Sequence, residues 1–128
     1  MPNTTLISNK TKKVLIIEDE GDICLLLNIM LKSDDIDLEH VNTLSGAKDY
    51  LTKVTPSLIL LDNKLPDGLG MDFIQFIKKN YPSIKIVMIS GFHPDLTKEV
   101  ALTNGADIYL EKPFTKEQVY QSIQELLN

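Results

Sequence analysis

Short runs of aliphatic residues alternate along the chain with longer segments in which apolar positions recur every three or four residues. Such runs are typical of buried β-strands, and such segments are typical of amphipathic helices. The pattern predicts five strands, at residues 14–18, 37–41, 57–61, 84–89 and 107–110. It predicts five helices, which begin near Glu20, Ser45, Gly70, Pro94 and Thr115. Strict alternation of strands and helices indicates an α/β protein with a parallel sheet between helices.

Two helix ends carry local signals. Thr115 followed by Gln118 fits a capping box, in which each side chain accepts a hydrogen bond from the other residue's backbone. Asn104-Gly105 predicts the end of the fourth helix, because glycine readily adopts the left-handed conformation found just past helix termini. The fourth and fifth helices therefore have at least one predicted boundary each.

The composition of the strands predicts their order in the sheet. A central parallel strand is buried on both faces and is apolar throughout, as are "VLII" (14–17), "LILL" (58–61) and "IVMI" (86–89). The second and fifth strands contain polar residues and are expected at the edges. Right-handed crossovers then give the order 2-1-3-4-5, a flavodoxin-like doubly wound sheet. In such sheets ligands bind beyond the carboxyl ends of the strands, here between the first and third strands.

Composition narrows the function classes. A chain of 128 residues fits one domain, expected at residues 12–128 after a flexible N-terminal tail at 1–11. A formal net charge of −5 argues against direct nucleic-acid binding, which needs clustered basic residues. No apolar stretch is long enough to span a membrane, no signal peptide is evident, and the single Cys24 can form no internal disulfide. We therefore expect a cytoplasmic protein without a membrane contact.

Charged and hydroxyl side chains follow four of the predicted strands. Glu18 and Asp19 end the first strand, and Asp62 ends the third. Ser90 ends the fourth strand, and Lys112 comes just after the fifth. Parallel strands place all of these side chains at one edge of the sheet.

The three acids predict a bound cation, since neighbouring carboxylates repel each other unless a positive charge lies between them. Neither His40 nor Cys24 is expected near this edge, so the available ligands are oxygens, which select a hard ion such as Mg²⁺. The acids also oppose a flavin or nucleotide site, because "EDEGDI" offers a phosphate only repulsion. With a cation, a hydroxyl and an ammonium close by, a carboxylate can attack phosphorus and form an aspartyl phosphate.

Four segments of the chain resemble the receiver domain of two-component response regulators, the CheY-like family. The segments are "VLIIEDE", "LILLDNKLPDGLG", "VMISG" and "GADIYLEKPF". Their order and spacing are similar to those of the family over about residues 12 to 127. The resemblance therefore extends over nearly the whole chain.

The resemblance implies a role for each site residue. Asp62 would be the phosphoacceptor, and Asp19 and Asp62 would bind Mg²⁺ together with the backbone carbonyl of Lys64. Glu18, which replaces the family's more usual Asp, would act through a metal-bound water. Ser90 and Lys112 would contact the phosphoryl group, and the Lys112-Pro113 bond is expected to be cis.

The resemblance also implies a switch and its partners. A sensor histidine kinase or a histidine phosphotransfer protein would supply the phosphoryl group. Ser90 and Tyr109 would then move and change the face formed by the fourth helix, fifth strand and fifth helix, where a downstream protein or a second copy would dock. Such a domain is a signalling domain and catalyses only its own phosphorylation and dephosphorylation.

Two alternatives remain open from the sequence. A haloacid-dehalogenase-like phosphatase would need a second Asp two residues after the nucleophile, where this chain has Lys64. A phosphorylation-independent scaffold of receiver form is usually marked by a missing acceptor, metal acid or lysine, and all of these are present. The sequence, which ends at Asn128, is expected to be either a stand-alone receiver or a fragment of a longer regulator.

Overall fold

The computed structural model describes residues 11–91 and 94–127, with the side chains of 94–96 left out of the description. Residues 1–10, most of the predicted tail, lie outside the described residues. Within the described ranges, no helix has the length and apolar character that crossing a membrane requires.

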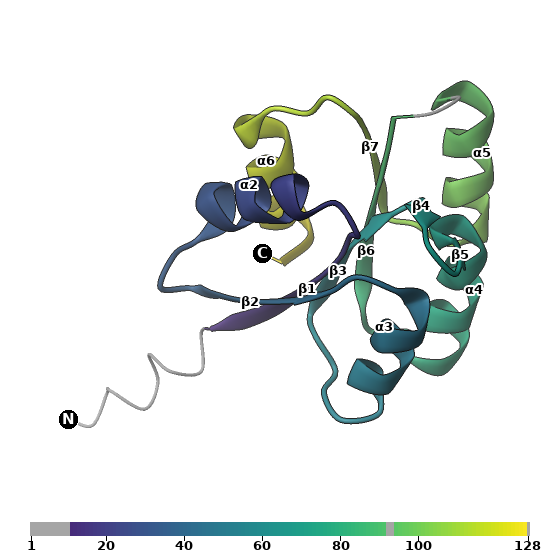
Figure 1. Cartoon of the computed structure of the whole chain (residues 1–128), viewed down its shortest axis with the longest axis horizontal. Helices are drawn as coiled ribbons and strands as arrows, with labels where there is room; N and C mark the ends of the chain where they lie inside the picture. Colours follow the sequence, from purple (N-terminus) through teal and green to yellow (C-terminus); the bar gives the residue numbers. More distant parts are fainter. Residues whose placement is uncertain (1–10, 92–93, 128) are drawn as a thin grey trace.

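A five-stranded parallel sheet forms the centre of the molecule (Figure 1). Its strands are β1 (Lys12–Ile17), β2 (Ile36–Val41), β3 (Leu58–Asp62), β6 (Lys85–Ser90) and β7 (Ile108–Glu111). Their order is β2-β1-β3-β6-β7, and every neighbouring pair is parallel. The predicted order 2-1-3-4-5 is therefore confirmed, as is the prediction that the second and fifth strands lie at the edges.

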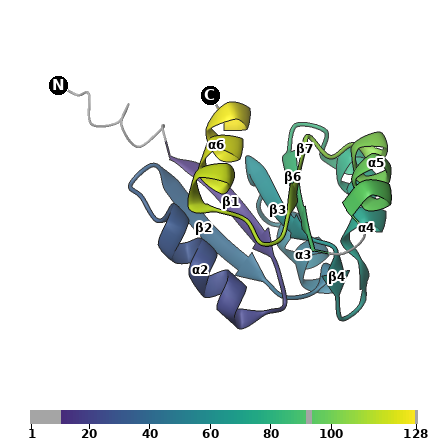
Figure 2. The ribbon, with the colours of Figure 1, turned by 90° about the horizontal axis from the view of Figure 1, so that it is seen from above.

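In the described part of the chain, five helices cover the two faces of the sheet. They are α2 (Gly21–Leu31), α3 (Leu44–Leu51), α4 (Gly70–Asn80), α5 (Pro94–Asn104) and α6 (Lys116–Leu127). Each begins within one residue of its predicted start. Seen from above, α2 and α6 lie on one side of the sheet and α3, α4 and α5 on the other (Figure 2). This is the flavodoxin-like doubly wound arrangement that the alternation of strands and helices predicts.

The central strands contribute side chains to two separate cores. Leu58 and Leu60 of β3 pack into the cluster under α2 and α6, while Ile59 and Leu61 pack into the cluster under α3, α4 and α5. All four side chains are almost fully buried. A strand buried on both faces has no position for a polar residue until it leaves the core, and in β3 that position is Asp62.

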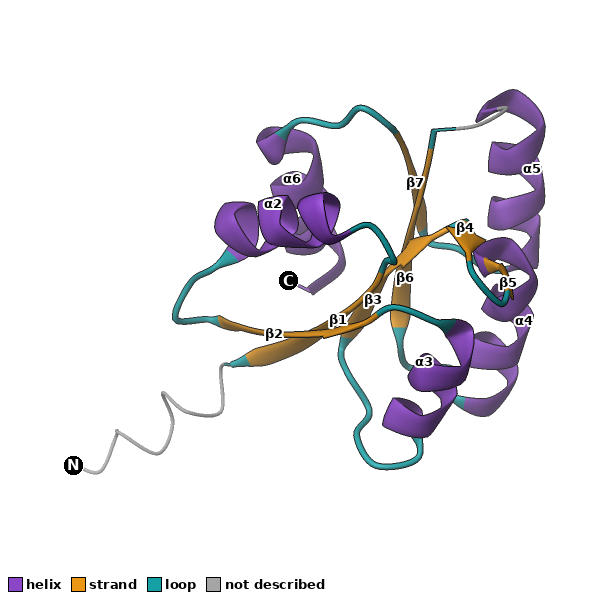
Figure 3. Cartoon of the chain, in the orientation of Figure 1, coloured by secondary structure: helices purple, strands orange, loops and turns teal. Residues whose placement is uncertain are grey.

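A small hairpin after β3 was not predicted. It consists of β4 (Lys64–Leu65) and β5 (Gly68–Leu69), two antiparallel two-residue strands that precede α4 (Figure 3). Strands this short give no hydrophobic period, so the sequence indicates only a loop with Pro66 and Gly68.

The predicted helix ends are confirmed. The Thr115 amide donates to Gln118 Oε1 at 2.8 Å, and the Gln118 amide donates to Thr115 Oγ1 at 3.1 Å, which is a complete capping box. Gly105 follows α5 with φ +122°, a conformation that side chains with a Cβ rarely adopt.

Candidate functional site

The predicted site residues meet at the carboxyl edge of the sheet. Asp62 and Ser90 are the last residues of β3 and β6, Glu18 and Asp19 follow β1, and Lys112 follows β7. An open hollow of about 200 Å³ lies here, lined by Glu20, Asp62, Lys64, Ser90, Gly91 and Lys112. Parallel strands bring these residues together although 94 positions separate Glu18 from Lys112.

Three carboxylates form one cluster within this edge. Glu18, Asp19 and Asp62 each offer an oxygen, and these oxygens lie within 4.8 Å of one another. Glu18 is 2% exposed and Asp62 is 5% exposed, whereas Asp19 is exposed to solvent. This set of hard oxygen donors, open to water on the side of Asp19, fits Mg²⁺, which binds through one or two carboxylates and keeps several waters.

The carboxyl group of Glu18 has a raised pKa. Burial raises its pKa to about 7, and the nearby charge of Asp62 acts in the same direction. The Glu20 amide donates to Glu18 Oε2 at 3.1 Å and so lowers the pKa of Glu18. The positive charge of Lys112 also lowers it. A raised pKa is the expected response of a buried acid beside other acids, and a bound cation would counteract it.

Lys112 supplies the positive charge at the site. Its Nζ lies 3.2 Å from Asp62 Oδ1 and 3.4 Å from Glu18 Oε1, with Glu20 Oε1 at 3.7 Å. Burial lowers the pKa of this ammonium, but the charges of Asp62 and Glu18 outweigh burial, so the pKa is raised. Lys112 therefore stays protonated. The Lys112-Pro113 peptide bond is cis, as predicted.

Ser90 and Lys64 border the same hollow. Ser90 is 3% exposed, and its carbonyl oxygen accepts a hydrogen bond from the Lys112 amide at 2.9 Å, which fixes the two residues relative to each other. Lys64 begins β4, two residues after Asp62, and lines the hollow. Both residues thus lie where the sequence places them.

Tyr109 lies on β7 and packs partly buried against the core under α3, α4 and α5. Its hydroxyl oxygen is buried and has no hydrogen-bond partner among the described residues. The aromatic ring thus occupies an inward position, and the movement expected of it stays a prediction.

Sequence reasoning did not find the contacts that two neighbours of Asp62 make. Asn63 Oδ1 accepts a hydrogen bond from the Met71 amide at 3.0 Å, so this side chain caps α4 from eight residues away. Gly70 lies against the backbone of Asp62, where an added Cβ would come within 2.1 Å of the Asp62 carbonyl oxygen. Helix-capping patterns span three residues, so a cap at this separation gives no sequence signal.

The expectation that His40 and Cys24 lie away from this edge was wrong. His40 Nε2 lies 2.9 Å from the Glu18 carbonyl oxygen, and the Cys24 thiol donates to the same oxygen at 3.5 Å. β2 pairs with β1 so that His40 lies opposite Ile16, and its ring reaches the end of β1 from there. Cys24 reaches the same oxygen from the first turn of α2. Both residues contact the backbone of Glu18, so the oxygen set of the cluster is unchanged.

A sequence profile of the response regulator receiver domain matches residues 14–124. The chain is 35% identical over 102 residues to the response regulator protein PilR of Pseudomonas aeruginosa, covering 80% of this chain and 23% of that protein. This chain thus spans less than a quarter of that relative's length.

Solved structures give the same result. A CheY-like response regulator receiver domain protein from Methanospirillum hungatei superposes with a TM-score of 0.85 at 26% identity, covering 91% of this chain and 94% of that chain. The receiver domain of NtrX from Brucella abortus superposes with a TM-score of 0.83 at 28% identity, covering 89% and 97%. The fold and site thus define a signalling domain of two-component systems. The chain belongs to the response regulator receiver domain family.

Proposed function

We propose that Asp62 accepts a phosphoryl group and that the remaining site residues assist this transfer. The observation that carries the proposal is the place of the Asp62 carboxylate, which ends a buried strand, is 5% exposed, and has Lys112 Nζ at 3.2 Å. A nearly buried carboxylate beside a lysine and two further acids is a costly arrangement that a structural role does not require.

In the transfer, one bond to phosphorus forms and one breaks. An Asp62 carboxylate oxygen forms a bond to phosphorus as the P–N bond of a phosphohistidine on the donor breaks. The imidazole leaves with the electron pair of that bond and takes up a proton. Lys112 and Ser90 would contact the phosphoryl oxygens, since both line the hollow in front of Asp62.

Asp19, Asp62 and the backbone carbonyl of Lys64 would hold Mg²⁺, with Glu18 acting through a bound water. When bound, the cation supplies charge neutralisation for the transferring phosphoryl group and for the acid cluster. The acid cluster itself supports this assignment, because three carboxylate oxygens lie within 4.8 Å of one another. Residues 12–128 would form the receiver domain that carries this chemistry, limited to its own phosphorylation and dephosphorylation.

A new phosphoryl charge would act on Ser90 and Tyr109 and, through them, on the face formed by α5, β7 and α6. These three elements are the fourth helix, the fifth sheet strand and the fifth helix along the chain. A sensor histidine kinase or a histidine phosphotransfer protein would be the donor. A downstream protein, or a second phosphorylated copy, would read the changed face.

Intact mass spectrometry tests the proposal. The chain is incubated with acetyl phosphate with and without Mg²⁺, beside the variant Asp62→Asn. We expect one alkali-labile phosphoryl group on the wild type with Mg²⁺ and none on the variant, because the amide cannot act as the nucleophile.

The other outcomes identify the alternatives. A folded wild-type chain that binds Mg²⁺ but gains no mass would favour the scaffold. Steady turnover of p-nitrophenyl phosphate would favour the phosphatase.

A further inference from the structure

The hairpin that follows the phosphoacceptor is hydrogen-bonded to a helix far from it in sequence. We propose that Asp67 is a positioning residue, whose carboxylate fastens the hairpin of β4 and β5 to the N-terminus of α3 and thereby fixes the backbone at Lys64. This inference rests on the proposed function, in which the Lys64 carbonyl contacts the cation.

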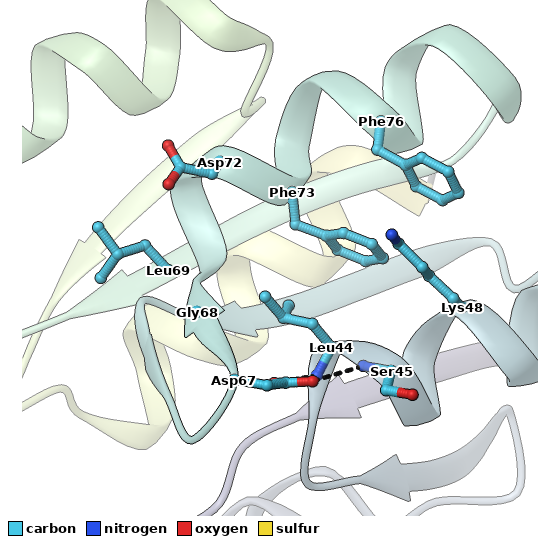
Figure 4. Close-up of a pocket in the computed structure, with 9 residues that line it drawn as sticks. All are labelled: Leu44, Ser45, Lys48, Asp67, Gly68, Leu69, Asp72, Phe73 and Phe76. Carbon is cyan, nitrogen blue, oxygen red and sulfur yellow. Dashed lines mark hydrogen bonds between the residues drawn. The ribbon is translucent and has the colours of Figure 1, made fainter.

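Both carboxylate oxygens of Asp67 are engaged by α3. The Leu44 amide donates to Asp67 Oδ1 at 2.8 Å, and the Ser45 amide donates to Asp67 Oδ2 at 2.9 Å. Figure 4 shows the carboxylate of Asp67 directed at the backbone of Leu44 and Ser45. These two hydrogen bonds are also the largest causes of the lowered pKa of Asp67, so the carboxylate is ionised at neutral pH.

The contact completes the cap of α3. The first amides of a helix have no partner within the helix, and in α3 these belong to Leu44, Ser45 and Gly46. The side chain of Thr43, the local cap, accepts a hydrogen bond from the Gly46 amide at 2.9 Å. Asp67 accepts hydrogen bonds from the other two amides, those of Leu44 and Ser45, although 23 and 22 residues separate it from them. The same two hydrogen bonds that cap α3 also restrict the position of Asp67, because a hydrogen bond constrains both of its partners.

Lys64 lies between two anchors of the same segment. On one side, the Asn63 side chain is bonded to the first turn of α4. On the other, Asp67 is bonded to α3 at the hairpin turn, and the strands between pair only Lys64 with Leu69 and Leu65 with Gly68. So short a ladder is weak by itself. Without the Asp67 contact the backbone at Lys64 would sample more positions, and the cation would lose a pre-formed ligand.

Asp72 provides a matched control. It is an exposed acid in the first turn of α4 and lines the same pocket of about 440 Å³ as Asp67 (Figure 4). Replacing either acid with alanine removes one negative charge near one helix N-terminus. Only Asp67 belongs to the segment that contains Lys64.

The experiment compares Asp67→Ala, Asp67→Asn and Asp72→Ala with the wild type. The Mg²⁺ dissociation constant is measured from amide chemical shifts, and hydrogen exchange is followed at the Leu44 and Ser45 amides. We expect Asp67→Ala to weaken Mg²⁺ binding about tenfold, by analogy with residues that orient metal ligands, and to speed exchange at both amides. Asp67→Asn keeps one acceptor oxygen and should fall in between, while Asp72→Ala should match the wild type.

Phosphorylation by acetyl phosphate gives a second, independent readout. A positioning role predicts that Asp67→Ala needs more Mg²⁺ for half-maximal rate yet reaches a near-normal rate at saturating Mg²⁺. An unchanged dissociation constant in Asp67→Ala, or an equal weakening in Asp72→Ala, would overturn the inference. If wild-type Asp62 gains no phosphoryl group while the Mg²⁺ constants still separate as expected, the proposed function fails and the positioning role stands.

Discussion

At the scale of single residues, the position of the Asp62 backbone depends on the absence of a side chain at Gly70. The Cβ of any other residue at position 70 would lie 2.1 Å from the carbonyl oxygen of Asp62, which is far closer than van der Waals contact. The obstructing atom is backbone at the end of a fully buried strand, so it cannot move aside without displacing Asp62.

The substitution Gly70→Ala should therefore destabilise the fold by about 1–3 kcal/mol, the range for overpacking, and slow phosphorylation of Asp62. Urea unfolding and intact mass after acetyl phosphate treatment measure the two effects. Gly21→Ala is the matched control, because a Cβ there meets nothing within 4 Å and alanine favours the helix. Equal stability of the two variants would contradict the close approach.

Asp67 makes stability depend on pH at the same scale. Its pKa is lowered from 3.8 because the Leu44 and Ser45 amides donate to it, and Lys48 of α3 acts in the same direction. A folded-state pKa below the unfolded value means that this stabilisation is present above about pH 4 and is lost as the pH falls through the lowered value.

The stability difference between the wild type and Asp67→Ala should thus be constant from pH 7 to pH 5 and should shrink below pH 4. Urea unfolding at a series of pH values measures it. A difference that stays constant down to pH 2.5 would show that the charge of Asp67 does not contribute.

At the scale of elements, α6 has an N-terminus formed by local sequence alone. The reciprocal hydrogen bonds between Thr115 and Gln118 satisfy amides that the helix cannot satisfy itself. The helix also buries Val119 and Ile123 in the core cluster that it shares with α2, so its place in the fold depends on packing as well as on the cap.

Thr115→Ala should cost about 1 kcal/mol of unfolding free energy, the usual effect of losing a threonine cap. Thermal or urea unfolding measures the loss, with Thr55→Ala as the control because Thr55 is exposed and lies outside the helices. A loss no larger than that of the control would mean that packing alone fixes the start of α6.

At the scale of the whole molecule, the acid cluster joins the ends of β1 and β3. Lys112, which follows β7, connects that strand to the cluster through its ion pairs with Glu18 and Asp62. Anything that binds these acids in the folded chain alone stabilises the whole domain by mass action. The proposed Mg²⁺ site should therefore be visible in the stability of the fold as well as in phosphorylation.

Mg²⁺ at about 100 times its dissociation constant should add about 2.7 kcal/mol of unfolding free energy and raise the melting temperature. The variant Asp19→Asn, which loses an exposed carboxylate of the cluster, should show a much smaller rise at the same Mg²⁺ concentration. Calorimetry with and without Mg²⁺ measures both. An equal rise in the variant would place the cation elsewhere.

Sequence reasoning identified the elements because each has its own period or composition. β3 is apolar throughout and lies in the centre, whereas "DIYL" is mixed and lies at an edge. It missed the hairpin of β4 and β5, which is too short to show a period. It also misplaced His40, since no local pattern shows that a ring on an edge strand reaches the carbonyl of Glu18 on its neighbour.

The sequence by itself determined the doubly wound sheet and the set of polar residues at its carboxyl edge. This is possible because alternating strands and helices allow few topologies and because parallel strands end together. Only the tertiary structure decided which contacts fix the backbone around these residues. Asn63 caps α4, and Asp67 caps α3. His40 and Cys24 both contact the carbonyl oxygen of Glu18. Such contacts join residues distant in sequence, and their geometry exists only after the helices have packed on the sheet.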